Sequence, residues 1–319
     1  MIRTERLTKR YGSFTAVDSV NLDIQPGEIY GFLGPNGAGK TSTIKMLLGI
    51  VRPTEGEMSL FGERSSPDRL DLRKRIGVVP EKHPVGMWSW MTATEYLQTF
   101  ADIFSVENAG GRIERLLDQV GLLPVARKRF SEFSHGMLQK LSFVRALLHD
   151  PDILFLDEPI SGLDPFGVKQ IRDLILEENR DGRTIFISSH ILSEMEKVCH
   201  RVGIIYRGRL MAQDAMKTLL DSLTRDRDLI VELEEVSDGL VDQLRSLPFV
   251  ISAVKDGNRL IVTVPKSGDH RKRLLKSLAE RDIEFLSLQE KSFSLEDAFV
   301  TITRDNIARL ADIAGDRDE

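Results

Sequence analysis

A glycine-rich segment near the N-terminus constrains this chain more than any other feature. It reads Gly34-Pro-Asn-Gly-Ala-Gly-Lys-Thr41 and lies between an apolar run at residues 29–33 and a helix-like stretch at residues 41–50. Glycines let backbone N–H groups turn inward and approach phosphate oxygens, and a following helix adds its positive N-terminal end. The segment therefore predicts a nucleotide-phosphate site, although a glycine-rich turn without a ligand is the alternative interpretation.

Two side chains of this segment have specific uses at such a site. The Lys40 ammonium can bridge the β- and γ-phosphates, and the Thr41 hydroxyl can ligate Mg²⁺. A second apolar run, at residues 153–156, has the character of a strand buried on both faces. Asp157 and Glu158 follow it, where a crevice forms at the carboxyl end of such a strand. We expect Asp157 to hold Mg²⁺ through water and Glu158 to act as general base; solvated loop acids are the alternative.

Strand-like and amphipathic segments alternate over the first 220 residues, which predicts an α/β domain around a largely parallel sheet. The expected strands and helices are residues 29–33, 153–156 and 184–188, and residues 41–50, 93–104, 112–120 and 137–149. A polar stretch at residues 221–228 then suits a linker. After it comes a strand-helix-hairpin-helix-strand order, typical of a ferredoxin-like α+β unit, with strands at 229–233, 250–255, 259–264 and 284–288.

Bulk composition excludes several classes of protein. The net charge of −5 argues against a nucleic-acid partner. The single cysteine, Cys199, rules out an internal disulfide and is expected to pack in the core. The N-terminus lacks a signal-peptide pattern, and no apolar stretch approaches the length that spans a bilayer.

Three later motifs follow the glycine segment in a fixed order: Phe133-Ser-His-Gly-Met137, Ile153-Leu-Phe-Leu-Asp-Glu158 and Ser188-Ser-His190. With them, the chain resembles the nucleotide-binding subunit of ATP-binding cassette (ABC) transporters over about residues 1–220, and more weakly to about residue 305. The resemblance implies a P-loop NTPase cassette at 1–222 with a helical subdomain at about 85–150. It also implies a small C-terminal domain at 223–305, as in one bacterial exporter branch, before an acidic tail at 306–319.

The resemblance also implies roles for individual residues. The family signature usually reads Leu-Ser-Gly-Gly-Gln; here Ser134 and Gly136 match it, whereas His135 and Met137 depart. In the family this element reaches the ATP of the opposite subunit, so a head-to-tail dimer with two ATP molecules is expected. Catalytic roles fall to Lys40, Glu158 and His190, and Mg²⁺ contacts to Thr41, Glu81 and Asp157. The expected ATP contacts are Tyr11, Gly34, Pro35, Asn36, Gly37, Ala38, Gly39, Lys40, Thr41, Ser42, Glu81, Ser134, Gly136, Met137 and Asp164.

Several of these roles have simpler alternatives. Tyr11, expected to stack on adenine, would otherwise be a surface tyrosine, and the Ile160–Asp164 loop would otherwise be a plain turn. Glu81 stands where the family commonly has glutamine. Because a carboxylate binds metal more strongly but repels an unshielded γ-phosphate, we hypothesise that Glu81 tightens the dependence on Mg²⁺.

Met87, Trp88 and Trp90 form an aromatic-rich segment in a chain that has only two tryptophans. In the family this region cups a coupling helix of the membrane subunit, and aromatic anchors would serve that contact. A small core beneath the helical subdomain is an equal alternative.

The resemblance thus implies an ATPase subunit of a transporter of the exporter kind. It would lie at the cytoplasmic face of the cell membrane, held there by a separate transmembrane permease. A soluble ABC ATPase that acts as a switch is the alternative. A small-molecule kinase is a third class, but the signature and switch segments have no role in one. The sequence does not identify the transported substrate.

Overall fold

The structure is a computed structural model that describes residues 1–66, 68–83, 85–223, 226–291 and 293–304. It divides into two compact units: Met1–Met216 with the chain from Ile302, and Lys217–Thr301. The boundary expected after residue 222 falls inside helix α9 (Met216–Leu223). The acidic tail expected at 306–319 lies outside the described residues.

A six-stranded sheet runs through the first unit in the order β10-β9-β3-β8-β7-β6. Its strands are β3 (Ile29–Leu33), β6 (Ile76–Val79), β7 (Ile153–Asp157), β8 (Thr184–Ser189), β9 (Arg201–Tyr206) and β10 (Arg209–Ala215). Every neighbouring pair is parallel except β9 with β10, which confirms the predicted, largely parallel sheet. Strands β3, β7 and β8 are buried along their whole length, and so they lack the alternation of a half-exposed strand.

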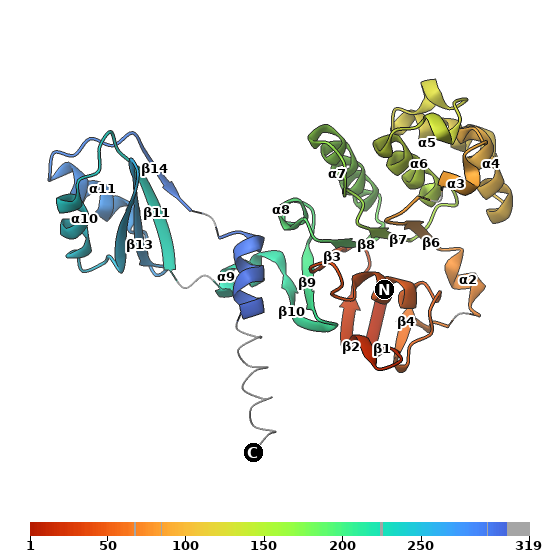
Figure 1. Ribbon diagram of the computed structural model, residues 1–319, viewed down its shortest axis with the longest axis horizontal. Coiled ribbons are helices and arrows are strands. Elements are labelled where there is room, and N and C mark those ends of the chain that lie inside the picture. The colour runs from red at the N-terminus through yellow and green to blue at the C-terminus, as the bar shows by residue number, and fades with distance from the viewer. Residues whose placement is uncertain (67, 84, 224–225, 292, 305–319) are drawn as a thin grey trace, which may run out of the picture. The chain divides into compact units, whose positions relative to one another are not determined.

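A second, antiparallel sheet precedes and flanks the nucleotide segment, in the order β2-β1-β4-β5. Its strands are β1 (Ile2–Tyr11), β2 (Phe14–Ile24), β4 (Glu55–Leu60) and β5 (Glu63–Arg64). The sequence patterns considered above do not predict it. Alternate residues of β2, namely Val20, Leu22 and Ile24, are buried in the same apolar cluster as Phe32 of the central sheet. Figure 1 shows β1, β2 and β4 on one side of the central sheet and helices α4 to α7 on the other.

The helices of the first unit are α1 (Lys40–Leu47), α2 (Leu70–Arg73), α3 (Val85–Trp88), α4 (Ala93–Phe104), α5 (Ala109–Gln119), α6 (His135–Leu147), α7 (Pro165–Arg180) and α8 (Leu192–Met195), with short turns η1 (Leu123–Val125) and η2 (Phe130–Glu132). Helices α4, α6 and α7 begin where a side chain accepts from one of the free N–H groups of the first turn. Thr92 caps α4 through a reciprocal pair with Glu95, and Ser134 and Asp164 cap α6 and α7. The Ser134 cap starts α6 two residues before the predicted position.

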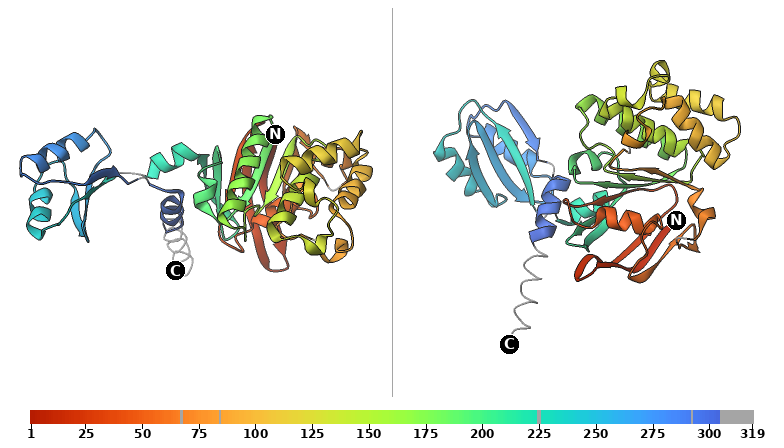
Figure 2. Two further views of the ribbon diagram at one scale, coloured as in Figure 1. Left: turned by 90° about the horizontal axis from the view of Figure 1, so that it is seen from above. Right: turned by 45° about the vertical axis from the view of Figure 1, so that its right-hand side comes forward.

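The second unit contains the element order that the sequence predicts. Its elements are β11 (Asp226–Glu232), α10 (Asp238–Arg245), β12 (Ser252–Asp256), β13 (Arg259–Pro265), α11 (Arg271–Ala279) and β14 (Ser287–Glu290), and residues 295–304 are helical. The strands form an antiparallel sheet in the order β12-β13-β11-β14. Both helices cover one face of it (Figures 1 and 2), where Leu229, Val231 and Leu260 pack against Leu244 and Leu274. The ferredoxin-like assignment of this unit stays a prediction.

The last strand starts three residues later than predicted, because the exposed Phe285 and Leu286 precede it and Leu288 is the residue that pairs with Val231. Cys199 is buried, as expected of a packing residue. Its sulfur lies 2.7 Å from the position that a Cβ atom on Gly31 would occupy, so the two positions fit closely together. Within the described ranges, no helix combines the length and apolar character required to traverse a bilayer.

Candidate functional site

The glycine-rich segment forms the turn between β3 and α1, at the carboxyl end of the central strand. Gly39 precedes α1 with φ +111°, a conformation that other residues rarely adopt. A Cβ atom on Gly34 would lie 2.3 Å from the carbonyl oxygen of Ile205, so this residue lets the loop pass directly against β9. Lys40 begins α1, and its Nζ donates to the carbonyl oxygens of Gly34 (2.7 Å) and Pro35 (3.2 Å). The lysine is therefore folded back over the loop, where a phosphate cradle requires its charge.

A cleft opens over this loop and collects most of the residues predicted to contact ATP. It is lined by Tyr11, Phe14, Ala16, Pro35, Asn36, Gly37, Gly39, Lys40, Thr41, Ser42, Glu81 and Glu158. Phe14 was not predicted; it is 64% exposed and lies across the β1–β2 turn from Tyr11, its pairing partner. The Lys9 ammonium lies 5.1 Å from the centre of the Tyr11 ring. The cleft thus has an aromatic end and a cationic, glycine-lined end, which suits a base and a polyphosphate.

Glu158 lies at the floor of the cleft between two basic side chains. Its Oε1 is 3.1 Å from Lys40 Nζ, and both side chains are more than nine-tenths buried. Its Oε2 accepts from His190 Nδ1 (2.8 Å) and from the His190 backbone N–H (3.3 Å). Because a carboxylate can only accept, His190 Nδ1 carries the hydrogen, and a neutral ring leaves Nε2 as an acceptor. Strand β8 thus delivers His190 to the carboxylate that β7 delivers.

The Glu158 backbone is held in an uncommon conformation, with φ +51°. Its N–H donates to the Ser188 carbonyl oxygen (3.1 Å) and approaches the Ser188 hydroxyl (3.2 Å). These contacts from the neighbouring strand fix the carboxylate at the end of β7. Ser188 was not among the predicted site residues, although it lies within the motif that ends in His190.

Asp157 lies close to Thr41 and within the electrostatic influence of Glu81 and Glu158. The Ser188 hydroxyl donates to Asp157 Oδ1. Burial raises the pKa of Asp157, and the negative charges of Glu81 and Glu158 raise it further, whereas hydrogen bonds from Ser188 and Thr41 oppose the shift. The negative charges of Glu81 and Glu158 therefore disfavour ionisation of Asp157, and a cation near Asp157 would relieve this repulsion.

Mg²⁺ takes oxygen ligands and usually keeps waters or substrate phosphates in its shell. The hydroxyl of Thr41 and the carboxylates of Asp157 and Glu81 are ligands of this kind. In the described part of the chain, no group of three or more His, Cys, Asp or Glu side chains is arranged to hold a metal by itself. The residues present therefore fit an Mg²⁺ ion that arrives with phosphate, rather than a metal held by protein ligands alone.

A second cavity contains four further predicted contacts, whereas Gly34 and Ala38 line neither cavity. Ser134, Gly136, Met137 and Asp164 line the second cavity, together with His135 and the exposed Phe166. Ser134 Oγ accepts from the Met137 N–H (3.3 Å), and Asp164 Oδ1 accepts from the Gly167 N–H (2.7 Å). These residues do not line the cleft that holds the glycine loop, so the predicted contacts form two separate sets.

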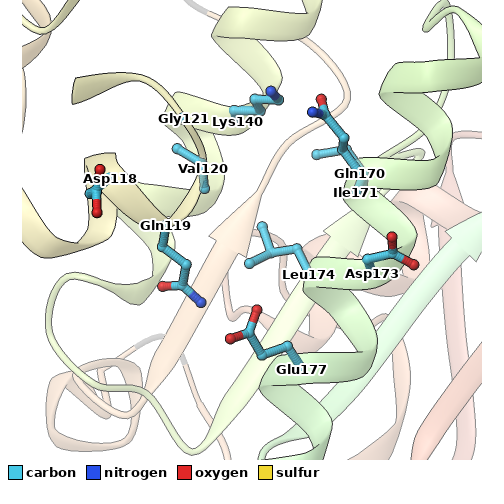
Figure 3. Close-up of a pocket in the computed structure, with 10 residues that line it drawn as sticks. All are labelled: Asp118, Gln119, Val120, Gly121, Lys140, Gln170, Ile171, Asp173, Leu174 and Glu177. Carbon is cyan, nitrogen blue, oxygen red and sulfur yellow. The ribbon is translucent and has the colours of Figure 1, made fainter. Parts of the chain in front are cut away.

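A third cavity lies between the end of α5, α6 and α7 (Figure 3). Its volume of ≈ 450 Å³ is similar to the ≈ 380 Å³ of the glycine-loop cleft, so size does not distinguish the two. The lining differs, because the third cavity carries Asp118, Asp173 and Glu177 with Lys140, and its described lining includes no glycine loop at a helix start. The glycine-loop cleft has both the loop and the first residues of α1, which suits phosphate oxygens better.

The aromatic segment after Glu81 separates into two environments. Trp88 packs edge-on against Tyr96 and Phe100, with ring centres 5.6 and 6.2 Å apart, and its side chain is half-buried. Met87 and Trp90 are 68% and 65% exposed. The ring contacts favour the core interpretation for Trp88, whereas contact with a partner remains a prediction for the other two.

Comparison with known proteins adds to this geometry. Residues 17–161 match the family model described as "ABC transporter", and residues 128–196 match one described as "AAA domain, putative AbiEii toxin, Type IV TA system". The chain is 38% identical over 95% of its length to the "Bacitracin transport ATP-binding protein BcrA" of Bacillus licheniformis, covering 97% of that protein. It is 30% identical over 95% of its length to the "Linearmycin resistance ATP-binding protein LnrL" of Bacillus subtilis (strain 168), covering 98% of it.

Solved structures give the same fold. A structure described as the ATP-binding subunit of an ABC transporter matches with a TM-score of 0.64 and 27% identity, over 70% of this chain and 92% of the other. A dimeric ATP-binding cassette in a post-hydrolysis state, bound to ADP and Pi, matches with a TM-score of 0.61 and 25% identity, over 68% of this chain and 99% of the other.

Proposed function

This chain belongs to the ATP-binding subunits of ABC transporters, which are ATPases coupled to transport, and we propose that it drives an exporter as a head-to-tail dimer. In this proposal two copies close around two Mg·ATP molecules and move a separate transmembrane permease. The observation that carries it is the position of Glu158 between Lys40 and His190 at the floor of the glycine-loop cleft.

The proposed chemistry divides among these side chains. Lys40 holds the β- and γ-phosphates. When ATP binds, phosphate oxygens replace the carbonyl oxygens of Gly34 and Pro35 and the Glu158 carboxylate as partners of its ammonium group. Glu158 then polarises the attacking water as general base, while His190 orients the carboxylate and senses the γ-phosphate through Nε2. A bound Mg²⁺ would neutralise phosphate charge from the side of Thr41, Asp157 and Glu81. Tyr11 stacks on adenine at the aromatic end of the cleft.

The second cavity supports the dimer. Ser134 and Gly136 present a hydroxyl and the start of a thirteen-residue helix, a combination suited to gripping a γ-phosphate. These residues lie apart from the chain's own nucleotide cleft, so in the proposal they serve the ATP of the partner copy, with Met137 and Asp164 beside them. The post-hydrolysis cassette, a structural relative, is described as dimeric and bound to ADP and Pi.

Export and membrane attachment are supported by the relatives rather than by residues of this chain. The two relatives above are named for bacitracin transport and linearmycin resistance. We propose that this protein lies at the cytoplasmic face of the membrane, held by its permease, and that the exposed Met87 and Trp90 take part in that contact. The cassette would occupy residues 1–222 and the smaller domain 223–305, with a supporting or regulatory role.

Two measurements test the proposal. Glu158→Gln should lower ATP turnover by about 10²- to 10⁴-fold, the usual contribution of a general base, while an ATP-bound dimer accumulates in size-exclusion chromatography. Normal hydrolysis in this variant would remove Glu158 as the base. Purification from solubilised native membranes should recover a stoichiometric polytopic protein, identified by mass spectrometry. Recovery with ribosomes or nucleic acid instead would favour a switch ATPase.

A further inference from the structure

Two histidines outside the proposed chemistry connect segments that belong to different cavities. His83 follows Glu81 by two residues, and its ring lies 5.8 Å from the ring of His135, centre to centre. His135 Nε2 is 3.0 Å from the carbonyl oxygen of Ser161. The pair thus spans from the loop beside the nucleotide cleft to the start of α6 and on to the loop before α7.

His83 is anchored on both of its nitrogens. Nε2 lies 2.7 Å from Gln139 Oε1, and Nδ1 lies 2.8 Å from Ser142 Oγ. Because the amide oxygen can only accept, His83 Nε2 carries a hydrogen and donates it, and in the neutral ring the Ser142 hydroxyl donates to Nδ1. Gln139 and Ser142 are 2% and 5% exposed on α6, so the ring is fixed to the buried face of that helix.

His135 is held as closely at its other end. A Cβ atom on Gly162 would lie 3.4 Å from His135 Nε2, so the loop before α7 packs directly against the ring. The Ser161 carbonyl oxygen accepts the Nε2 hydrogen of His135. A displacement of either histidine ring therefore shifts the helix start that carries Ser134, the loop that leads to Asp164, or both.

We propose that His83 and His135 are positioning residues that couple the chain's own nucleotide cleft to the surface that serves its partner's nucleotide. The coupled parts are Glu81 on one side, and Ser134, Gly136 and the loop ending at Asp164 on the other. This inference rests on the proposed function, since it assumes that the second cavity contacts ATP of another copy. Neither histidine touches ATP in the proposal; the pair sets the distance between residues that do.

The test compares two variants with a matched control in steady-state ATP hydrolysis. His83→Leu removes both hydrogen bonds and should lower kcat by about tenfold, with little change in KM, because a positioning contact acts on the assembled site. His83→Gln keeps a donor near the Nε2 position for Gln139 Oε1, so it should restore kcat. The control, His270→Gln, removes a histidine that stacks on Phe249 in the second unit and should behave as wild type.

A double variant separates coupling from local damage. His83→Leu with His135→Leu should turn over no more slowly than the slower single variant, because both changes break one connection. Unchanged kcat in His83→Leu, or an equal loss in kcat and rise in KM, would overturn the inference. If His83→Leu fails to fold, unchanged kcat in His135→Leu would overturn it. A wild-type protein without ATP turnover would instead refute the proposed function.

Discussion

The buried ion pair between Lys40 and Glu158 provides a prediction about stability that is independent of catalysis. The two charges are 3.1 Å apart, and the side chains are only 6% and 7% exposed. At an effective dielectric constant of about 20, their attraction is about 5 kcal/mol, which desolvation of both groups offsets in large part. Removing one partner leaves the other charge buried. We therefore expect Lys40→Met and Glu158→Gln each to reduce the free energy of unfolding by about 3 kcal/mol.

The double variant should be more stable than the sum of the single changes predicts. Lys40 keeps its two carbonyl acceptors and Glu158 keeps His190, so a coupling energy of about 2 kcal/mol is expected rather than the full attraction. Urea unfolding followed by tryptophan fluorescence suits the measurement, because Trp88 and Trp90 are the only tryptophans and both lie in the first unit.

A surface pair of the same unit serves as the control for this cycle. Arg10 and Glu55 are 2.7 Å apart but 48% and 56% exposed, so their coupling should stay below about 1 kcal/mol. If the effects of Lys40→Met and Glu158→Gln add within about 0.5 kcal/mol, the two charges do not stabilise one another and the reasoning is refuted.

Three further predictions concern the cleft. Gly34→Ala should weaken ATP binding in isothermal titration, because its Cβ would lie 2.3 Å from a carbonyl oxygen of β9, whereas Gly110→Ala, with open space around its Cβ, should bind as wild type. Burial, with Glu81 and Glu158 nearby, raises the pKa of Asp157 above its unfolded value. The metal-free protein should therefore lose thermal stability as the pH rises from the unfolded pKa through the folded pKa, because the folded state binds this proton more tightly. Asp157→Asn should not show this loss. Glu81→Gln should lower the dependence of ATP turnover on Mg²⁺; an unchanged Mg²⁺ titration would reject a metal-side role for this carboxylate.

Local patterns made the centre of the fold predictable. The glycine loop, the apolar run that ends in Asp157 and the helix stop before Pro151 each depend on residues adjacent in sequence. The N-terminal antiparallel sheet was not predicted. The sequence of β2 does show the alternation that indicates a strand, because Val20, Leu22 and Ile24 alternate with polar residues. Bulges in the β1–β2 pairing break that alternation elsewhere, and so only the second half of β2 shows it.

Side-chain contacts between distant segments are the part of the site that no local pattern encodes. The bonds from His83 to Gln139 and Ser142 join residues 56 and 59 positions apart, and a lone histidine in a loop indicates neither partner. The same limit applies to the aromatic segment. Trp88 and Trp90 are two residues apart, yet one packs against Tyr96 and the other is exposed, because α3 ends between them.

Two of the unusual motif residues of this chain, Glu81 and His135, have related consequences. Glu81 adds a carboxylate beside Asp157, which is already hard to ionise, so the metal side of the cleft repels a phosphate until a cation neutralises it. The loop that carries Glu81 also carries His83, which contacts His135 at the start of α6. When a cation neutralises Glu81 and fixes its loop, His83 would therefore be fixed as well, and through His135 so would the start of α6. On this reasoning Mg²⁺ and the partner surface are linked through one short loop, and Glu81→Gln should weaken the effect of Mg²⁺ on dimer formation as well as on turnover.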